Sequence, residues 1–262
     1  MARALRRVLP ALLLVLALAV LSGCESTFDE AERIRAEQGT IADVVAVDVQ
    51  QTEGITAETL AIIPSEDGLM AAVVIEVSST GPGLLWAPIE VTLLDAGGAE
   101  VGTNNVPGAD PTLIHLPSLV EGGKALYVND QIAITGTPAE AQVTVAGVPV
   151  TAQLLPGLKV ENAIVTEDPS FGTTWTASVV NTTDVRQEQV IVQAILRDGT
   201  TITSAGLAIV QGLDPGATAE VQGFFLGTGK GKLEVFAPSA NGTDGAGAPS
   251  AEQAGDATVS MQ

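Results

Sequence analysis

The chain contains a single histidine and a single cysteine, so few of its side chains are suited to nucleophilic or acid–base chemistry. His115 lies in the apolar segment Leu113-Ile114-His115-Leu116-Pro117. A general base or a catalytic triad requires oriented partners, and no spacing around His115 indicates them. We therefore interpret His115 as a structural or surface residue at a strand edge. One Cys and one His also exclude a disulfide framework, a Cys/His zinc site and haem ligation built from this chain alone.

Carboxylates are the other candidates for chemistry. Pairs such as Glu66-Asp67 and Glu167-Asp168 have the residue types of a glycoside hydrolase, which uses one carboxyl group as acid and a second as base or nucleophile. Most acidic residues, however, stand beside Gly, Pro or Ser, and this is typical of turns and solvated loops. We predict no catalytic residue, and we rank a carboxylate-pair hydrolase as the least favoured function.

Calcium is the ion that an acidic, oxygen-rich surface favours. Three sets of side chains could meet at one end of a β-sandwich, but none has the spacing of an EF-hand or a Gly-rich calcium repeat. The sequence therefore predicts no metal site and no cofactor, with calcium binding kept as an alternative. The three sets are Asp95-Ala-Gly-Gly, Asn104-Asn105 with Asp110, and Glu167-Asp168 with Asp184.

Two tryptophans differ in their surroundings. Trp175 belongs to the apolar face of an expected strand and is predicted to lie in a core. Trp86 lies in Gly81-Pro82-Gly83-Leu84-Leu85-Trp86-Ala87-Pro88, which reads as a loop. A loop Trp flanked by Leu is a candidate contact with a partner protein, and the alternative is that it caps the open end of a sandwich.

The charge of the chain restricts its partners. Lys and Arg number 11 against 31 Asp and Glu, for a net charge of -20. Three of the basic residues, Arg3, Arg6 and Arg7, lie in the first 23 positions, which leaves 8 bases and 31 acids in the remainder. Nucleic acid is an unsuitable partner because phosphate binding requires clustered cations. Anionic lipid headgroups are disfavoured for the same reason.

The N-terminus has the three parts of a secretory signal: a basic start, an apolar run from Val8 to Leu21, and small residues before Cys24. The run is too short to span a bilayer, which requires about 20 apolar residues. Leu21-Ser22-Gly23-Cys24 resembles the lipobox of bacterial lipoproteins. This resemblance implies cleavage after Gly23, acylation of Cys24 (palmitate and related chains), and anchoring to the extracytoplasmic face of the cell membrane. The alternative is that Cys24 stands by chance beside an ordinary cleavage site.

The remaining sequence predicts an all-β protein. Residues 24–40 form a lipidated linker that is rich in helix formers and ends at Gly39, as expected for a short polar helix. After Gly39, β-branched residues, Gly and Pro become frequent, and Asp67-Gly68 is typical of a hairpin turn. The expected strands include Thr59 to Ile63, Met70 to Val77, Ile89 to Leu93, Ala125 to Ala133, Ala141 to Ala146, Lys159 to Thr166, Thr173 to Val180, Gln189 to Arg197, Leu207 to Gln211, Ala219 to Phe225 and Lys232 to Ala237.

The chain also resembles itself at an offset of 102 residues. This offset places Val73, Ile75 and Val77 on Trp175, Ala177 and Val179, and Ile89 on Ile191. A shift of one residue in the second copy matches as well there, because Val190, Val192, Ala194 and Leu196 also alternate. We predict two tandem β-sandwich domains, residues 41–153 and 154–237, joined near Leu155-Pro156-Gly157, with a disordered tail over 238–262.

The second copy resembles the FxLYD-type immunoglobulin-like domain of bacterial envelope proteins. The resemblance rests on Trp175-Thr-Ala-Ser-Val-Val-Asn181-Thr-Thr, Val190 to Gly199 and Leu213-Asp-Pro-Gly216, although Ala194-Ile-Leu-Arg-Asp198 departs from the motif that gives the family its name. It implies a β-sandwich and an envelope location, and the family has no shared catalytic residues to carry over. We therefore expect a lipid-anchored, non-enzymatic interaction or scaffold module that contacts another envelope protein. The alternative is a solute- or cation-binding (Ca²⁺) envelope lipoprotein.

Overall fold

The computed structural model describes residues 49–106, 115–147, 149–150, 154–168 and 172–241. The predicted signal peptide, Cys24, the predicted linker over residues 24–40 and residues 242–262 lie outside these ranges. Within them every regular element is a strand, which confirms the all-β fold. The described residues accordingly contain no helix that is long and apolar enough to cross a membrane.

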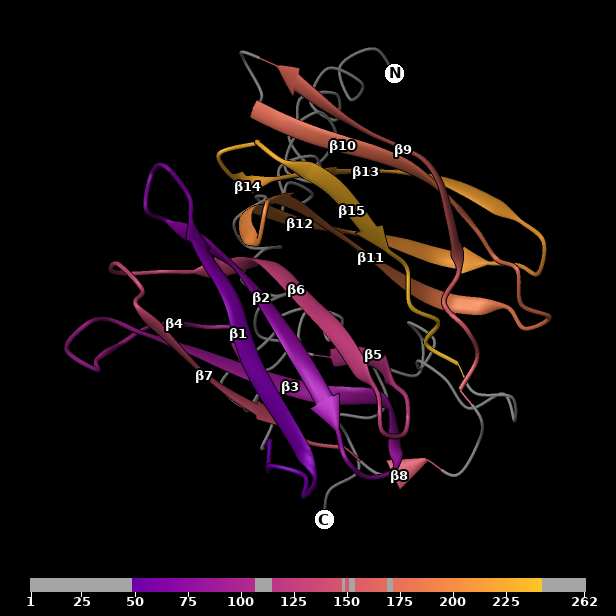
Figure 1. Cartoon of the computed structure of the whole chain (residues 1–262), viewed down its shortest axis with the longest axis horizontal. Coiled ribbons are helices and arrows are strands. Elements are labelled where there is room, and N and C mark those ends of the chain that lie inside the picture. Colours follow the sequence, from indigo (N-terminus) through magenta and orange to yellow (C-terminus); the bar gives the residue numbers. More distant parts are fainter. Residues whose placement is uncertain (1–48, 107–114, 148, 151–153, 169–171, 242–262) are drawn as a thin grey trace, which may run out of the picture. The chain divides into compact units, whose positions relative to one another are not determined.

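The N-terminal sandwich has two antiparallel sheets (Figure 1). The first has the order β1-β2-β6, and the second is centred on β3, with β4 and β7 flanking its C-terminal part and β5 and β8 its N-terminal part. Apolar side chains from the two sheets form one core, to which Val73, Ile75 and Val77 belong as predicted. The strands are β1 (Ile55–Pro64), β2 (Met70–Ser79), β3 (Gly83–Leu94), β4 (Glu100–Thr103), β5 (His115–Leu119), β6 (Lys124–Ala133), β7 (Glu140–Val145) and β8 (Pro149–Val150).

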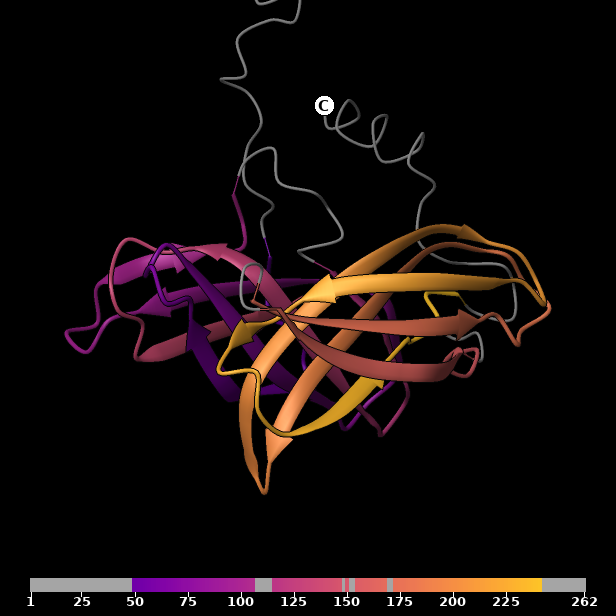
Figure 2. The same ribbon diagram turned by 90° about the horizontal axis from the view of Figure 1, so that it is seen from above.

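The C-terminal sandwich repeats this arrangement, with the sheets β13-β10-β9 and β14-β12-β11-β15. Trp175 is completely buried in its core, as predicted. Figure 2 shows the strands of the two sandwiches as two groups, one in indigo to magenta and one in orange to yellow. The strands are β9 (Lys159–Asp168), β10 (Gly172–Val180), β11 (Gln187–Asp198), β12 (Thr201–Leu213), β13 (Thr218–Phe224), β14 (Leu226–Gly227) and β15 (Lys232–Phe236).

Corresponding strands have corresponding neighbours in the two sandwiches. The order β1-β2-β6 matches β9-β10-β13, and β4-β3-β7 matches β12-β11-β15. The offset of 102 is correct for β2 and β10, whose matched residues face the two cores. It is wrong for β3 and β11, because Ile89, Val91 and Leu93 face one core whereas Val190, Val192 and Ala194 face the other. The alternative with a shift of one residue is therefore the correct register.

A third apolar cluster joins the two sandwiches, which belong to one compact unit of the chain. It combines the outer face of β2 and β6 with the outer face of β11 and β12. As a result β2 is buried on both faces, and Ala71 to Ile75 are all inaccessible to solvent. The members of this cluster, which we call the shared core, are Ala72, Val74, Val128, Ile195, Ile202 and Ala205.

The ordered chain extends beyond residue 237, where the disordered tail was predicted to begin. Ser239, Ala240 and Asn241 are buried. The Ser239 hydroxyl donates to Gln187 Oε1 at 3.0 Å, and Asn241 Nδ2 donates to the carbonyl of Arg186 at 2.9 Å. These hydrogen bonds hold residues 239–241 against the C-terminal sandwich without a large apolar surface.

Candidate functional site

The junction of the two sandwiches contains a pocket of about 570 Å³. Its walls come from the β5–β6 region of the N-terminal sandwich, from the segment Leu155 to Leu158 before β9, and from β15 with the residues that follow it. The lining residues are Ser118, Val120, Lys124, Ala125, Leu126, Leu155, Pro156, Gly157, Leu158, Val160, Val235, Phe236, Ala237, Pro238 and Ser239.

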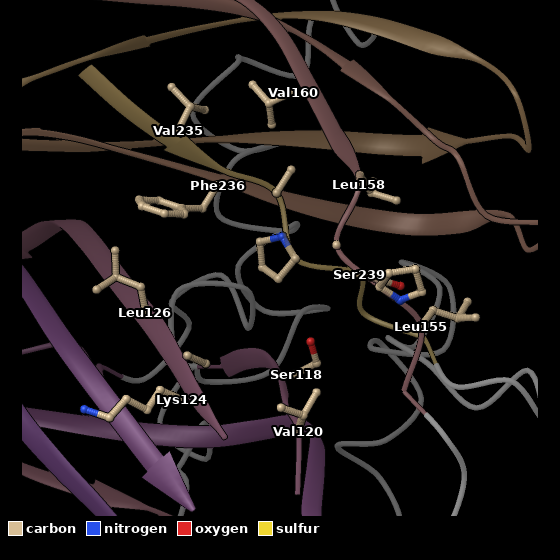
Figure 3. A pocket seen from close by; sticks show the side chains of 15 residues that line it. Ser118, Val120, Lys124, Leu126, Leu155, Leu158, Val160, Val235, Phe236 and Ser239 are labelled. Carbon is tan, nitrogen blue, oxygen red and sulfur yellow. The ribbon is translucent and has the colours of Figure 1, made fainter. Parts of the chain in front are cut away.

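The lining is mainly aliphatic, with Phe236 as its aromatic side chain (Figure 3). Phe236 comes from the C-terminal sandwich and Leu126 from the N-terminal sandwich, and the Ser118 hydroxyl points toward the interior of the pocket. The charged lining residue, Lys124, directs its ammonium group away from the pocket and forms an ion pair with Glu76 of β2. The hydrogen bond and the charge of Glu76 raise the pKa of Lys124. The lining side chains are therefore mostly apolar, although polar atoms also contribute to the lining surface. Of the two lining hydroxyls, that of Ser239 is bonded to Gln187, and that of Ser118 points into the pocket.

Hydrogen bonds hold together the pocket wall that is formed by residues 155–158 and residues 237–241. The amide of Leu158 donates to the carbonyl of Ala237 at 2.7 Å, and the amide of Leu155 donates to that of Asn241 at 3.1 Å. Gln187 is completely buried and accepts the Ser239 hydroxyl. Pro156 and Pro238 add fixed φ angles to the same wall. The pocket is thus formed without a ligand.

Trp86 lies in β3 and not in a loop, contrary to prediction. β3 pairs with β5 in unbroken register from Leu84 to Pro88. Within this stretch Trp86 has a φ of 50°, which is unusual for a residue with a side chain. The long edges of β3 pair with several short strands, and this pairing extends the strand through the Gly- and Pro-containing segment that suggested a loop.

His115 begins β5 and pairs with Pro88 of β3, so its assignment to a strand edge is correct. The Trp86 and His115 rings stack, with centroids 5.0 Å apart and planes at 9°. Both residues are half-buried. The pairing of β3 with β5 thus places the candidate contact residue Trp86 against the sole imidazole of the chain.

Among the described residues, the three sets proposed for calcium form no group of metal ligands. Asp95 Oδ1 accepts the amides of Gly97 and Ala99 at 2.8 and 2.9 Å, so it closes its own turn. Asn104 is buried in the N-terminal sandwich and accepts the Val91 amide at 2.7 Å. Asp110 lies outside the described residues, among which no three His, Cys, Asp or Glu side chains are grouped for a metal ion.

The two carboxylate pairs considered for hydrolysis lie at a hairpin turn and at a strand end. Asp67 Oδ1 accepts the Ser65 hydroxyl at 2.5 Å and the Leu69 amide at 3.1 Å in the β1–β2 hairpin, and these hydrogen bonds lower its pKa. Glu167 and Asp168, at the end of β9, line a second pocket of about 380 Å³ together with Lys230. Each pair is therefore adjacent to a turn or a strand end, as its sequence context indicated.

Asp130 is a buried carboxylate that the sequence did not single out. It lies in β6 on the side of the shared core, and its Oδ2 accepts the amide of Leu207 in β12 at 3.1 Å. Its Oδ1 is buried without a hydrogen-bond partner. Burial raises the pKa of Asp130 to about 6. The available signal was an acid in the interior of the predicted strand Ala125 to Ala133, two residues from Val128 and Ile132.

No family model matches this chain, and no curated protein matches it significantly. The resemblances to bacterial lipoproteins and to FxLYD-type domains therefore rest on the residues of the chain itself.

Proposed function

We propose that the protein is a lipid-anchored, non-enzymatic interaction module on the extracytoplasmic face of the cell membrane. Cys24 would carry the acyl chains, since two or more such chains hold a protein stably at a bilayer. The mature chain would contact another envelope protein through a partly exposed aromatic surface, because its acidic charge suits neither nucleic acid nor anionic headgroups.

The conformation of Trp86 is the observation that carries this proposal. A bulky residue at positive φ is a genuine outlier, and such strain is concentrated at functional sites. Trp is also enriched among the residues that dominate binding energy at protein interfaces. We therefore assign the contact surface to the Trp86–His115 stack.

Crosslinking in intact cells, followed by capture of the anchored chain, tests this assignment. We expect a discrete envelope protein to be recovered with the wild type and to be lost with Trp86→Gly. Gly relieves the positive φ, so this variant should unfold close to the wild-type temperature. Phe224→Ala, which removes an exposed aromatic residue of β13, is the matched control and should retain the partner. Equal recovery with Trp86→Gly would refute the assignment.

Membrane anchoring is tested separately. Cys24→Ala should move the protein from the membrane fraction to the soluble fraction, and its thermal unfolding should be unchanged. Continued membrane association of this variant would contradict the lipobox interpretation.

A second candidate function is the binding of a solute, and the pocket at the junction of the sandwiches favours it. Ligand pockets commonly occur at such interfaces, with volumes of about 300–1,000 Å³. The apolar lining favours an uncharged solute over the calcium ion that we considered from the sequence.

A further inference from the structure

We propose that the junction pocket binds a neutral, predominantly apolar small molecule with one hydroxyl or carbonyl group, of the class of long-chain alcohols. This inference rests on the second candidate function and is independent of partner contact at Trp86.

The pocket has the size and the surface of a ligand site. Its volume of about 570 Å³ lies within the range of small-molecule pockets. Leu158 and Ala237, which are 6% and 4% exposed, line its buried part, whereas Val120 and Phe236 retain 49% and 39% exposure. A ligand would therefore cover apolar side chains that now contact water, which favours binding.

The charges around the pocket indicate a neutral ligand. The lining contains no carboxylate that would attract a cation. Lys124 is paired with Glu76 and directs its ammonium group away from the pocket, so an anion would find no free positive charge there. The net charge of -20 further disfavours anions.

A single polar group of the ligand can be accommodated. The Ser118 hydroxyl points into the pocket (Figure 3), and a hydroxyl both donates and accepts. The hydrogen-bonded wall of Leu155, Leu158 and Ser239 is formed in advance, which reduces the ordering cost of binding. An alcohol or a carbonyl group attached to an apolar body matches this combination.

Photoaffinity labelling of the full-length chain in isolated membranes tests the proposal. The probe is a long-chain alcohol that carries a diazirine on its hydrocarbon chain, and labelled peptides are mapped by mass spectrometry. We expect label on the segments around Leu155–Leu158 and Val235–Ser239, with saturation as the probe concentration rises and displacement by the unlabelled alcohol. Labelling without saturation, or only outside these segments, would overturn the proposal while leaving partner capture through Trp86 unaffected.

Two variants and one control make the test specific to the pocket. Phe236→Ala removes the aromatic wall. It should raise the probe concentration at half-saturation by roughly tenfold, which is the effect of losing one buried apolar side chain. Val120→Trp should block the pocket from an exposed position that tolerates a larger side chain. Phe224→Ala, an exposed Phe outside the pocket, should label as the wild type. Wild-type saturation in both pocket variants would also overturn the proposal.

Discussion

Asn104 shows how a single polar side chain replaces part of a strand. Its Oδ1 accepts the Val91 amide at 2.7 Å, and its Nδ2 donates to the Ile89 carbonyl at 2.8 Å and to the Tyr127 hydroxyl at 2.9 Å. The side chain thereby continues the pairing to β3 beyond the end of β4. Burial of the Tyr127 hydroxyl raises its pKa to about 12, so it remains protonated.

Asn104→Ala should lower the free energy of unfolding by about 3 kcal/mol, because buried backbone groups of β3 lose their partners. Urea denaturation measures this change. Asn105→Ala is the matched control, since the adjacent side chain contacts Glu90 at a longer 3.3 Å, and its cost should be clearly smaller. Equal costs for the two variants would contradict the strand-replacing role.

Asp130 should make stability depend on pH. Its pKa is raised to about 6 in the folded state by burial, against 3.8 for an ordinary Asp, so the fold favours the protonated form. Its contribution to stability is therefore complete below pH 3.8 and is lost as the pH rises through about 6. The difference corresponds to about 3 kcal/mol. β12, which supplies the Leu207 amide, contains no ionisable side chain that would compensate the charge.

Asp130→Asn removes this charge and keeps an acceptor for Leu207. The variant should match the wild type near pH 4 and become increasingly more stable than it toward pH 7.5, as measured by melting temperature. Asp198→Asn, at the exposed C-terminal end of β11, should show no such widening difference. A parallel pH profile for Asp130→Asn and the wild type would refute the assignment.

At the scale of elements, two glycines make room for the core tryptophan of the C-terminal sandwich. Trp175 in β10 packs against Gly223 of β13 and Gly206 of β12. A Cβ atom at Gly223 would lie 2.6 Å from the indole ring, much closer than any real contact. The glycines thus determine how closely the strands approach the ring.

Gly223→Ala should therefore lower the free energy of unfolding by about 2 kcal/mol, the usual cost of overpacking a core. Gly81→Ala provides the control, because a Cβ atom there meets nothing within 4 Å. Chemical denaturation of both variants measures the difference. Equal stability of Gly223→Ala and Gly81→Ala would contradict this role of Gly223, because β13 would then have to be free to move away from Trp175.

The extent to which the sequence predicts these elements follows from how each strand is buried. In β2, Glu76 and Ser78 interrupt one face, so the alternation of Val73, Ile75 and Val77 identified the core side correctly. β11 carries buried apolar side chains on both faces, because Ile195 contributes to the shared core while Ala194 faces the sandwich core. Alternation of apolar residues then does not determine the register, and the sequence left two possibilities open.

Sites that join distant segments were less accessible to sequence reasoning. The pocket combines β6, the segment Leu155 to Leu158 before β9 and the residues after β15, and no local sequence pattern indicates that these segments meet. Trp86 was identified as a candidate contact from its apolar neighbours, but its stacking on His115 depends on the pairing of β3 with β5. Asp130 was missed because its burial arises only when the second sandwich packs on β6.

At the scale of the molecule, the two sandwiches associate through unlike faces. The outer face of the β1-β2-β6 sheet meets the outer face of β11 and β12. A contact between unlike faces leaves an equivalent face free on the second sandwich, so a further sandwich could in principle pack there in the same way. The corresponding outer face in the C-terminal sandwich, that of β9-β10-β13, has Thr174 and Thr176 at the positions of Ala72 and Val74. Polar side chains at these positions disfavour a third sandwich on that face.

This asymmetry gives a test of how the sandwiches are coupled. The wild type should unfold in one cooperative transition, because the shared core makes each sandwich stabilise the other. Val74→Glu places an unpaired charge in the shared core and should cost about 3 kcal/mol or more, separating the unfolding of the two sandwiches into two transitions. Thr176→Glu, at the equivalent position of β10, should retain one transition with little change in midpoint. Calorimetry of the full-length chain distinguishes these outcomes. A single transition in Val74→Glu with wild-type stability would show that the shared core does not couple the sandwiches.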